Sequence, residues 1–453
     1  MAKKEYSIDM VNGPLTKNVI RFTVPLMLTS LLQMCFNTAD TIVVGRFAGD
    51  NALAAVGATG SLCFLMVTMF NGLAMGANVV IAKFFGAEDR KGVENSVHTA
   101  MLLSLISGVL LTLVGVLCAE PLLKLMQTPD SIIGQSLLYL RIYFGGALFF
   151  LVYNFGAAVL RSKGDTRRPL YFLAISGVLN VVLNLIFVIV FHWGVAGVAT
   201  ATVASNALSS IFVVITLLKE NDATRIYPSR LKLNAGITKE ILRIGIPAGI
   251  QGAMFALSNL VIQSSINSFG SETIVAGNSA AANIENFVYV GMNFTSATMT
   301  FISQNIGARK YNRIGKITGV TMALNAGCAA FISLSLYMFG KSILGLYTTS
   351  PDVVSYGMIR MTWVCLFLWL NGVMDVFLSA LRGMGHSTMP TVSMIVCICG
   401  FRLVWLFTVF RAVRTLPIIY YCFPISWVLT SVVLGVMWIC AYKKLKRKPV
   451  GQI

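Results

Sequence analysis

Charged residues are scarce in this sequence. They make up 11% of its 453 residues, whereas 56% are hydrophobic and the mean hydropathy is +0.78. A water-soluble globule of this length exposes far more charge, so the composition excludes that class and indicates an integral membrane protein. The apolar runs are long and continuous, without the alternation of barrel strands, which favours membrane-spanning helices.

Motifs for nucleotide hydrolysis and for metal catalysis are missing as well. The sequence has no Gly-x-x-x-x-Gly-Lys-Ser/Thr loop, and its three histidines (His98, His192 and His386) are dispersed. Most of the nine cysteines lie within apolar runs, and Cys397 and Cys399 have no companion loop of ligands. We therefore expect no enzyme activity, no cofactor and no resident metal, and nucleotide hydrolysis cannot drive this protein.

Acidic residues are few, 17 against 35 Lys and Arg, which gives a net charge of +18. Such a charge would suit a nucleic-acid partner, but Lys and Arg cluster in short loops on alternate sides of the apolar runs, as the positive-inside rule requires. We therefore expect no nucleic-acid partner, a multi-pass protein of the cell membrane, and both termini in the cytoplasm.

The apolar runs predict twelve transmembrane helices. We expect them at 18–45, 52–82, 95–118, 132–159, 169–191, 195–218, 239–268, 274–304, 317–340, 353–381, 389–411 and 417–442. The one long polar connector divides them into two sets of six. The predicted domains are an N-terminal six-helix bundle over 1–218, a cytoplasmic linker over 219–238, and a C-terminal six-helix bundle over 239–453.

The two halves repeat in sequence. The segment 160–169 recurs at 381–390 with Arg, Gly and Pro in the same register, and Pro25 recurs at nearly the same shift as Pro247. Six spans per half mean that both copies enter the membrane from the same side, so the repeats are parallel. The predicted fold is an all-α membrane protein of twelve helices, in two pseudo-symmetric six-helix bundles around a central cleft.

A polar stripe marks the first span. Gln33, Asn37 and Asp40 fall on one helix face, and Pro25 near the start of the span can bend the helix. A carboxylate within a span costs roughly 2.5–3.5 kcal/mol on insertion scales, so it usually faces a protein or water-lined interior. The stripe predicts part of an ion or substrate path. The alternative is that Asp40 merely lies at the aqueous end of the helix, because Arg46 follows six residues later.

Polar residues elsewhere in the first half are candidate partners of Asp40. Asn180 and Asn184 share one face of the fifth span, Thr202 lies early in the sixth, and Asn154 lies in the fourth. Carboxylate, amide and hydroxyl oxygens suit transient Na⁺ coordination or a proton-carrying network. The alternative is that these side chains only bond neighbouring helices.

The second half has no acid at the position that corresponds to Asp40. It carries Glu285 in the eighth span, Asp375 in the tenth and Arg402 in the eleventh, and these three are candidates for a second site. An arginine embedded among acids suggests a buried ion pair, which could be structural or functional.

Several stretches resemble the multidrug and toxic compound extrusion (MATE) family, along almost the whole chain. They are NTADTIVVG at 37–45, the repeated segments 160–169 and 381–390, and SQNIGA at 303–308. The sequence is more similar to the DinF-like and MepA-like bacterial members than to the NorM branch, because the seventh span lacks the glutamate of that branch. Relatives of the DinF-like type carry Asp where Asn184 stands.

The resemblance implies a secondary antiporter that expels cationic or amphipathic compounds in exchange for H⁺ or Na⁺ by alternating access. In such relatives a first-helix carboxylate, matched here by Asp40, is central to coupling and works with residues matched by Asn180 and Asn184. Bending of the first helix accompanies transport. The alternative function is a lipid-linked precursor flippase of the same superfamily, although such proteins need cationic cavities. The expected partners are small molecules and the bilayer, and the expected state is a monomer.

Overall fold

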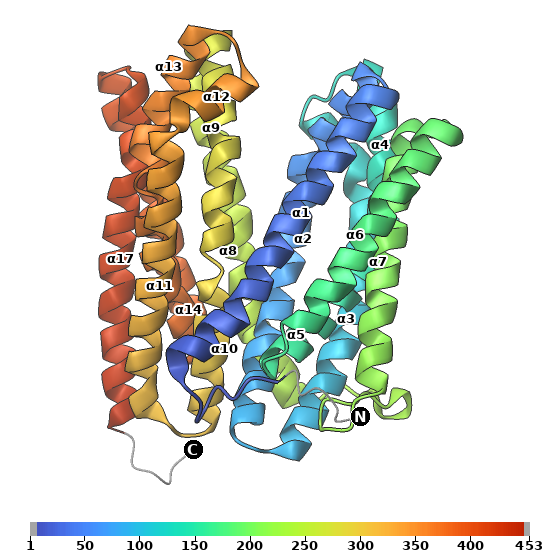
Figure 1. Ribbon diagram of the computed structural model, residues 1–453, viewed down its shortest axis with the longest axis vertical. Helices are drawn as coiled ribbons and strands as arrows, with labels where there is room; N and C mark the ends of the chain where they lie inside the picture. Colours follow the sequence, from blue (N-terminus) through green and yellow to red (C-terminus); the bar gives the residue numbers. More distant parts are fainter. Residues whose placement is uncertain (1–6, 448–453) are drawn as a thin grey trace. The chain divides into compact units, whose positions relative to one another are not determined.

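The computed structural model describes residues 7–447, which form helices joined by short turns and, within that range, no β-strand (Figure 1). The helices are α1 (Leu15–Phe47), α2 (Asp50–Gly86), α3 (Arg90–Leu125), α4 (Asp130–Gly145), α5 (Ala147–Ser162), α6 (Arg167–Leu185), α7 (Gly194–Leu218), α8 (Ala235–Asn267), α9 (Glu272–Gly291), α10 (Phe294–Gly307), α11 (Tyr311–Met338), α12 (Gly340–Tyr347), α13 (Pro351–Arg360), α14 (Leu368–Gly383), α15 (Thr388–Met394), α16 (Phe401–Trp405) and α17 (Leu416–Lys446). The π-helical segments are η1 (Ile186–Val190), η3 (Met361–Cys365), η4 (Ile395–Gly400) and η5 (Leu406–Phe410), and η2 (Pro228–Arg230) is a 3₁₀ turn.

The predicted all-α membrane fold is confirmed. Within the described residues, ten helices, some of them continued through a π segment, are long and apolar enough to cross a membrane. Together, α4 and α5 are also long and apolar enough to cross a membrane, and they bend by 44° at the break at Gly146; counted as one span, they would bring the number to eleven. A Cβ at Gly146 would lie 2.4 Å from Val203, so the absence of a side chain lets α7 pack against this bend.

The predicted span at 274–304 differs from the others. It is helical, but it consists of α9 and α10 with a break at Met292 and Asn293, and it is not among the ten apolar helices. The reason is its polarity, since it carries Glu285 and several amide side chains along a short stretch.

The described chain divides into two compact units. Unit 1 comprises residues 24–249 with the chain up to Asp9, and unit 2 comprises Met10–Thr23 with the chain from Ile250 onward. The boundaries of these units differ from those of the halves predicted from the sequence, because α1 and α8 each contribute residues to both units. The division falls next to Pro25 in α1 and just after Pro247 in α8, the two prolines that correspond in the repeat.

In unit 1, the first part of α8 packs on α2 through glycine. A Cβ on Gly72 would lie 2.4 Å from the backbone oxygen of Gly245, and one on Gly249 would lie 2.2 Å from the backbone oxygen of Met69. Gly76 makes a similar approach one turn further along α2. Glycines four residues apart on both helices let the two backbones touch, as in the small-xxx-small contacts of membrane helices.

The segment that joins α7 to α8 is also fastened within unit 1. The Tyr227 amide donates to Nε2 of His98 at 3.0 Å, Arg230 pairs with Glu94 at 2.9 Å, and the Thr99 hydroxyl donates to the Lys232 carbonyl at 3.3 Å. The predicted linker therefore packs along α3 as an ordered part of this unit.

Unit 2 has its own apolar core, formed by α9, α11, α13, α14 and α17 with the π segments η3, η4 and η5. Polar contacts join three of its helices. Asn325 on α11 donates to the Gly372 carbonyl of α14 at 3.0 Å, and Arg382 on α14 donates to the Gln251 side chain of α8 at 2.5 Å.

Candidate functional site

Asp40 lies on α1 where this helix packs closely on α6. A Cβ on Gly177 would lie 1.8 Å from the Phe36 ring, so only glycine at this position of α6 admits the ring. Asp40 follows Phe36 by one helical turn and is half-buried, whereas Gln33 and Asn37 are exposed. Tyr139 packs with the cluster of Val43 and Val44 that follows Asp40 along the helix.

The structure brings Asp40 together with both predicted asparagines. The Asn184 side-chain amide donates to the Asp40 carboxylate, and the same nitrogen lies 3.3 Å from Oδ1 of Asn180. Asn184 is fully buried, and Asn180 is 5% exposed. The Asn184 Oδ1 atom is also buried and has no hydrogen-bond partner within the described residues. The Asp40 carboxylate and the Asn180 amide oxygen therefore meet at the Asn184 amide inside unit 1, and the oxygen of that amide has no partner there.

A π-helical segment begins directly after this cluster. The α-helix α6 ends at Leu185, and η1 occupies Ile186–Val190. Single π turns in α-helices are rare and occur frequently at functional sites, because the extra residue per turn redirects neighbouring side chains. No simple sequence pattern predicts this feature.

Two other predicted partners do not join the cluster through hydrogen bonds. The Thr202 hydroxyl donates to the Val198 carbonyl at 3.0 Å, and Nδ2 of Asn154 donates to the Phe150 carbonyl at 2.8 Å. Both are bonds to the preceding turn of the same helix, so they satisfy the side chain locally. Near the start of α1, the Thr29 hydroxyl donates to the Pro25 carbonyl at 2.8 Å in the same way.

The expected pairing of Arg402 with the acids of the second half is wrong. Glu285 instead receives two hydrogen bonds from Arg360, from Nε at 2.8 Å and from Nη2 at 2.7 Å. Arg360 lies on α13 where its planar guanidinium can meet both carboxylate oxygens, a geometry that favours it over Arg402. No ion pair to Arg402 or to Asp375 occurs among residues 7–447.

The Glu285–Arg360 pair is part of a larger network that the sequence did not reveal. Nη1 of Arg360 donates to Oδ1 of Asn278 at 2.6 Å, and the Tyr420 hydroxyl donates to the same oxygen at 3.0 Å. Arg360 also lies 5.8 Å from the centres of the Tyr420 and Phe423 rings. The only sequence signal was that Arg360 lies inside an apolar span.

Asp375, the other acid within the predicted spans of unit 2, lies apart from this pair. Its carboxylate accepts a long hydrogen bond of 3.4 Å from Nδ2 of Asn371, one turn earlier on α14. It interacts electrostatically with Arg382, seven residues later, without forming an ion pair. Asp375 is thus a weakly bonded acid, in contrast to Glu285.

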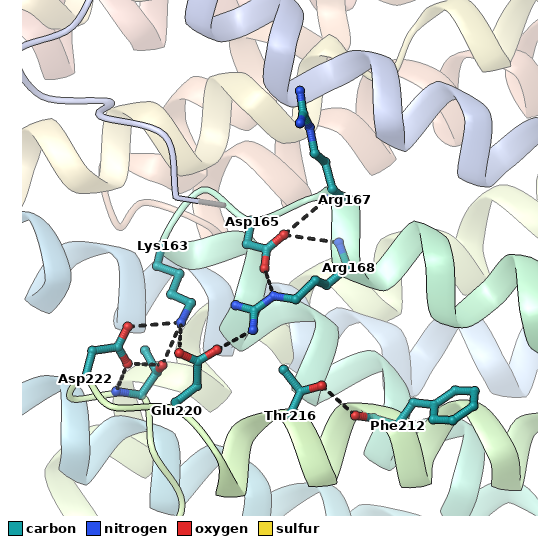
Figure 2. A network of polar contacts seen from close by, with 9 residues as sticks. Lys163, Asp165, Arg167, Arg168, Phe212, Thr216, Glu220 and Asp222 are labelled. Carbon is teal, nitrogen blue, oxygen red and sulfur yellow. Dashed lines mark hydrogen bonds and ion pairs between the residues drawn. The ribbon is translucent and has the colours of Figure 1, made fainter. Parts of the chain in front are cut away.

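A third network holds the turn between α5 and α6 (Figure 2). Lys163, which is 3% exposed, pairs with Glu220 and Asp222, each at 3.0 Å. Arg168 bonds the Asp165 carboxylate and pairs with Glu220 at 2.5 Å. Asp165 caps α6, because its carboxylate accepts hydrogen bonds from the first two backbone amides of that helix.

Electrostatics within this network favour the ionised form of Asp222. Burial raises the pKa of that carboxyl, but the Lys163 ammonium and the hydroxyl and amide of Thr224 together hold the pKa below its usual range. These contacts fasten the start of the α7–α8 connector to unit 1.

None of these clusters has the composition of a stable metal centre. Within residues 7–447, no group of three or more His, Cys, Asp or Glu side chains could hold a metal ion. The Asp40 cluster has one carboxylate and neutral oxygens, which suits reversible binding of a monovalent cation better than a resident divalent metal.

Known proteins provide an independent comparison. The profile of the MatE family matches residues 25–186 and 247–408 of this chain. A probable multidrug resistance protein of Bacillus subtilis, YpnP, is 29% identical over 83% of this chain and 84% of its own length. The probable multidrug resistance protein NorM of Thermotoga maritima is 24% identical (85% and 84%), and the multidrug export protein MepA of Staphylococcus saprophyticus is 22% identical (83% of each).

Solved structures have the same fold. A MOP-superfamily transporter from Pyrococcus furiosus superposes with a TM-score of 0.91 at 22% identity and covers 99% of this chain and 100% of its own. A multidrug resistance MATE transporter in an outward-facing conformation gives 0.89 at 22% identity, with 98% and 100% covered. The multidrug names of the relatives do not favour the flippase alternative. The chain belongs to the MatE family and is a multi-pass membrane transporter rather than an enzyme.

Proposed function

We propose that this transporter is a secondary antiporter, which exports cationic or amphipathic compounds in exchange for H⁺ or Na⁺ by alternating access. The relatives described above are named for multidrug resistance or export, and the sequence has no motif that would supply energy from a nucleotide. Export against a gradient must then draw on an ion gradient, and an intramembrane acid is the usual place where that ion binds.

The contact between Asp40 and Asn184 carries this proposal. Asp40 is the only acid on α1, and its partners are neutral, so its charge is compensated by hydrogen bonds alone. A bound cation would add the missing charge. The unpartnered Asn184 Oδ1 and the Asn180 Oδ1 give Na⁺ two further oxygens. If Asp40 is protonated, a flip of the Asn184 amide would bring its Oδ1 to accept a hydrogen bond from the carboxyl group.

Coupling follows if the cation and the exported compound compete for the negative charge of the Asp40 carboxylate. A cation on Asp40 removes its attraction for a cationic compound and so favours release of that compound. Because α1 contributes to both units and contains Pro25, a change at Asp40 acts on the helix that belongs to both. Bending near Pro25 would remove no backbone bond there, since proline lacks the amide hydrogen.

The proposal includes location and state. We infer that the transporter lies in the cell membrane with both termini in the cytoplasm, since Lys and Arg concentrate in the loops on that side of the predicted spans. We also infer that it acts as a monomer and needs no cofactor beyond the coupling ion.

Proteoliposomes with defined gradients test the proposal. Efflux of a cationic dye such as rhodamine 123 is followed after imposing only a pH gradient, only a Na⁺ gradient, or neither. We expect one of the two gradients alone to drive efflux, and this identifies the ion. Efflux that requires ATP, or that proceeds equally without any gradient, would contradict antiport.

A further inference from the structure

Arg402 is a buried cation in unit 2 with few partners. It lies on α16 and is 3% exposed. Its Nε donates to the Ser426 hydroxyl at 3.2 Å, and its guanidinium carbon lies 4.2 Å from the centre of the Phe423 ring. Its two terminal nitrogens have no hydrogen-bond partner within the described residues.

Comparison with Arg360 shows what Arg402 lacks. Arg360 is held by the two oxygens of Glu285 and by Asn278, so its charge and its donors are both satisfied. Arg402 has one neutral oxygen and one aromatic face, and neither carries a full negative charge. The two arginines lie in the same unit. Arg402 is buried and the Arg360 side chain is 12% exposed, yet only Arg360 forms an ion pair within residues 7–447.

A buried charge without a partner is expensive. Most side chains escape this cost by releasing or taking up a proton, but an arginine does not lose its proton in proteins. The favourable solution is an anion that meets the free terminal nitrogens. A guanidinium presents these donors in a plane, and a carboxylate matches them with two parallel hydrogen bonds.

The local backbone points to the same residue. The α-helical turn that carries Arg402 is only five residues long, and it is bracketed by π segments, with η4 ending at Gly400 and η5 beginning at Leu406. The cluster at Asn184 and the Arg360 network also stand next to a π segment. In this fold, therefore, π turns accompany buried polar groups, and Arg402 has one on each side.

Two side chains of opposite charge in this unit, Asp375 and Arg402, both act electrostatically on Tyr289 of α9. No ion pair joins Asp375 to Arg402 in the described part of the chain, so neither side chain neutralises the other. A ligand that carried both a cationic and an anionic group would complement both.

We propose that Arg402 binds the carboxylate of exported compounds that are zwitterions, through its two free terminal nitrogens. This inference rests on the proposed export function and names a class of substrate for it. The exported compounds would then include molecules with one cationic and one carboxylate group. Arg402 would bind these molecules more tightly than their esters, which lack the negative charge.

Two fluorescent dyes that differ in one group test this proposal. Rhodamine 110 has a free carboxylate, and rhodamine 123 is its methyl ester. Binding of each dye to purified protein in phospholipid nanodiscs is measured by fluorescence anisotropy, for the unchanged protein and for Arg402→Gln. We expect Arg402→Gln to weaken rhodamine 110 binding about ten-fold or more, as for the loss of a charged hydrogen-bond pair, and to leave rhodamine 123 within about two-fold.

Controls separate a binding role from a structural one. Arg414→Gln removes an exposed arginine that bonds Ser268 and should change neither dye. Arg402→Lys keeps the charge but loses the planar pair of donors, so it should weaken rhodamine 110 by an intermediate factor. Thermal stability of Arg402→Gln should equal or exceed that of the unchanged protein, because the substitution removes a buried charge.

The other outcomes overturn the proposal. An equal loss of both dyes would mean that Arg402 is structural, and no loss of either would mean that another anion satisfies it. The measurement is repeated in maltoside micelles, which contain no phospholipid. If Arg402 favours rhodamine 110 over rhodamine 123 in micelles but not in nanodiscs, a lipid phosphate binds this arginine in the membrane instead. Binding needs no ion gradient, so a failure here leaves the antiport proposal standing.

Discussion

Glu285 and Arg360 form a bidentate ion pair in the interior of unit 2, with nitrogen–oxygen distances of 2.8 and 2.7 Å. The pair joins α9 to α13, and Asn278 and Tyr420 extend it to α17. Since Arg360 neutralises it, Glu285 has no charge left over for a coupling cation. We interpret the pair as a structural element, which leaves Asp375 as the weakly bonded acid within the predicted spans of this unit.

Removing one member of this pair should destabilise the protein strongly. Glu285→Gln leaves Arg360 charged and poorly compensated, at a cost of about 3–5 kcal/mol. Thermal unfolding in detergent should show a large decrease in Tm. Glu120→Gln is the control, because the pair of Glu120 with Lys124 is exposed and should contribute nothing measurable. The structural interpretation is wrong if both variants melt at the temperature of the unchanged protein.

The glycine contact between α2 and α8 gives a second prediction. Gly72→Ala places a methyl group 2.4 Å from the backbone oxygen of Gly245, and neither backbone can move away without separating the helices. We expect a loss of about 1–3 kcal/mol in stability. Gly57→Ala, on the same helix with no atom near its Cβ, should be neutral or slightly stabilising. Similar melting temperatures for the two variants would contradict the close contact.

The Asn184 amide should matter more for transport than the Asn154 amide. Asn184→Ala removes the donor to Asp40, and we expect gradient-driven efflux to fall about ten-fold or more. Asn154→Ala removes only a bond within its own helix and should transport almost normally. Efflux is measured at matched amounts of inserted protein. Equal activity of the two variants would exclude Asn184 from the coupling cluster.

The stability contributed by Asp222 should depend on pH. Its pKa in the folded protein is depressed, so its contribution is fully present above the unfolded pKa of about 4 and is lost as the pH falls through the folded pKa. Because Asp222 is partly exposed, the contribution is at most about 1 kcal/mol. Asp222→Asn should lower Tm at pH 7, and the difference from the unchanged protein should shrink below pH 4. A difference that grew on acidification would reverse the assigned sign.

The fold could be predicted largely from the sequence because its causes are local. Long apolar runs, a repeated motif and two corresponding prolines are visible in one dimension, and they led to the helical membrane fold. The cluster around Asp40 was also predictable, since Asn180 and Asn184 are one turn apart and must share a face. The contacts of Thr202 and Asn154 were harder to predict, because a hydroxyl or an amide in a helix can form its hydrogen bond with a carbonyl of the preceding turn.

What the sequence could not provide depends on distances between helices. In the second half, two embedded arginines (Arg360 and Arg402) and two embedded acids (Glu285 and Asp375) were visible in the sequence, but their pairing is set by how α9, α13 and α16 pack. Arg360, rather than Arg402, meets Glu285 as a result. The π segments were likewise unpredictable, since they follow from a single extra residue per turn and leave no hydropathy signal. The attachment of the first part of α8 to α2 rests on glycines that look like ordinary small residues in sequence.

Cation release on substrate binding tests the central claim, that Asp40 holds the coupling ion, most directly. Rhodamine 123 is added to the purified protein in weakly buffered detergent, while a pH electrode and bound radioactive sodium report the two cations. We predict that the unchanged protein releases H⁺ or Na⁺ as the dye binds, and that Asp40→Asn binds the dye without releasing either. Release of the same cation in the same amount by Asp40→Asn would contradict the account.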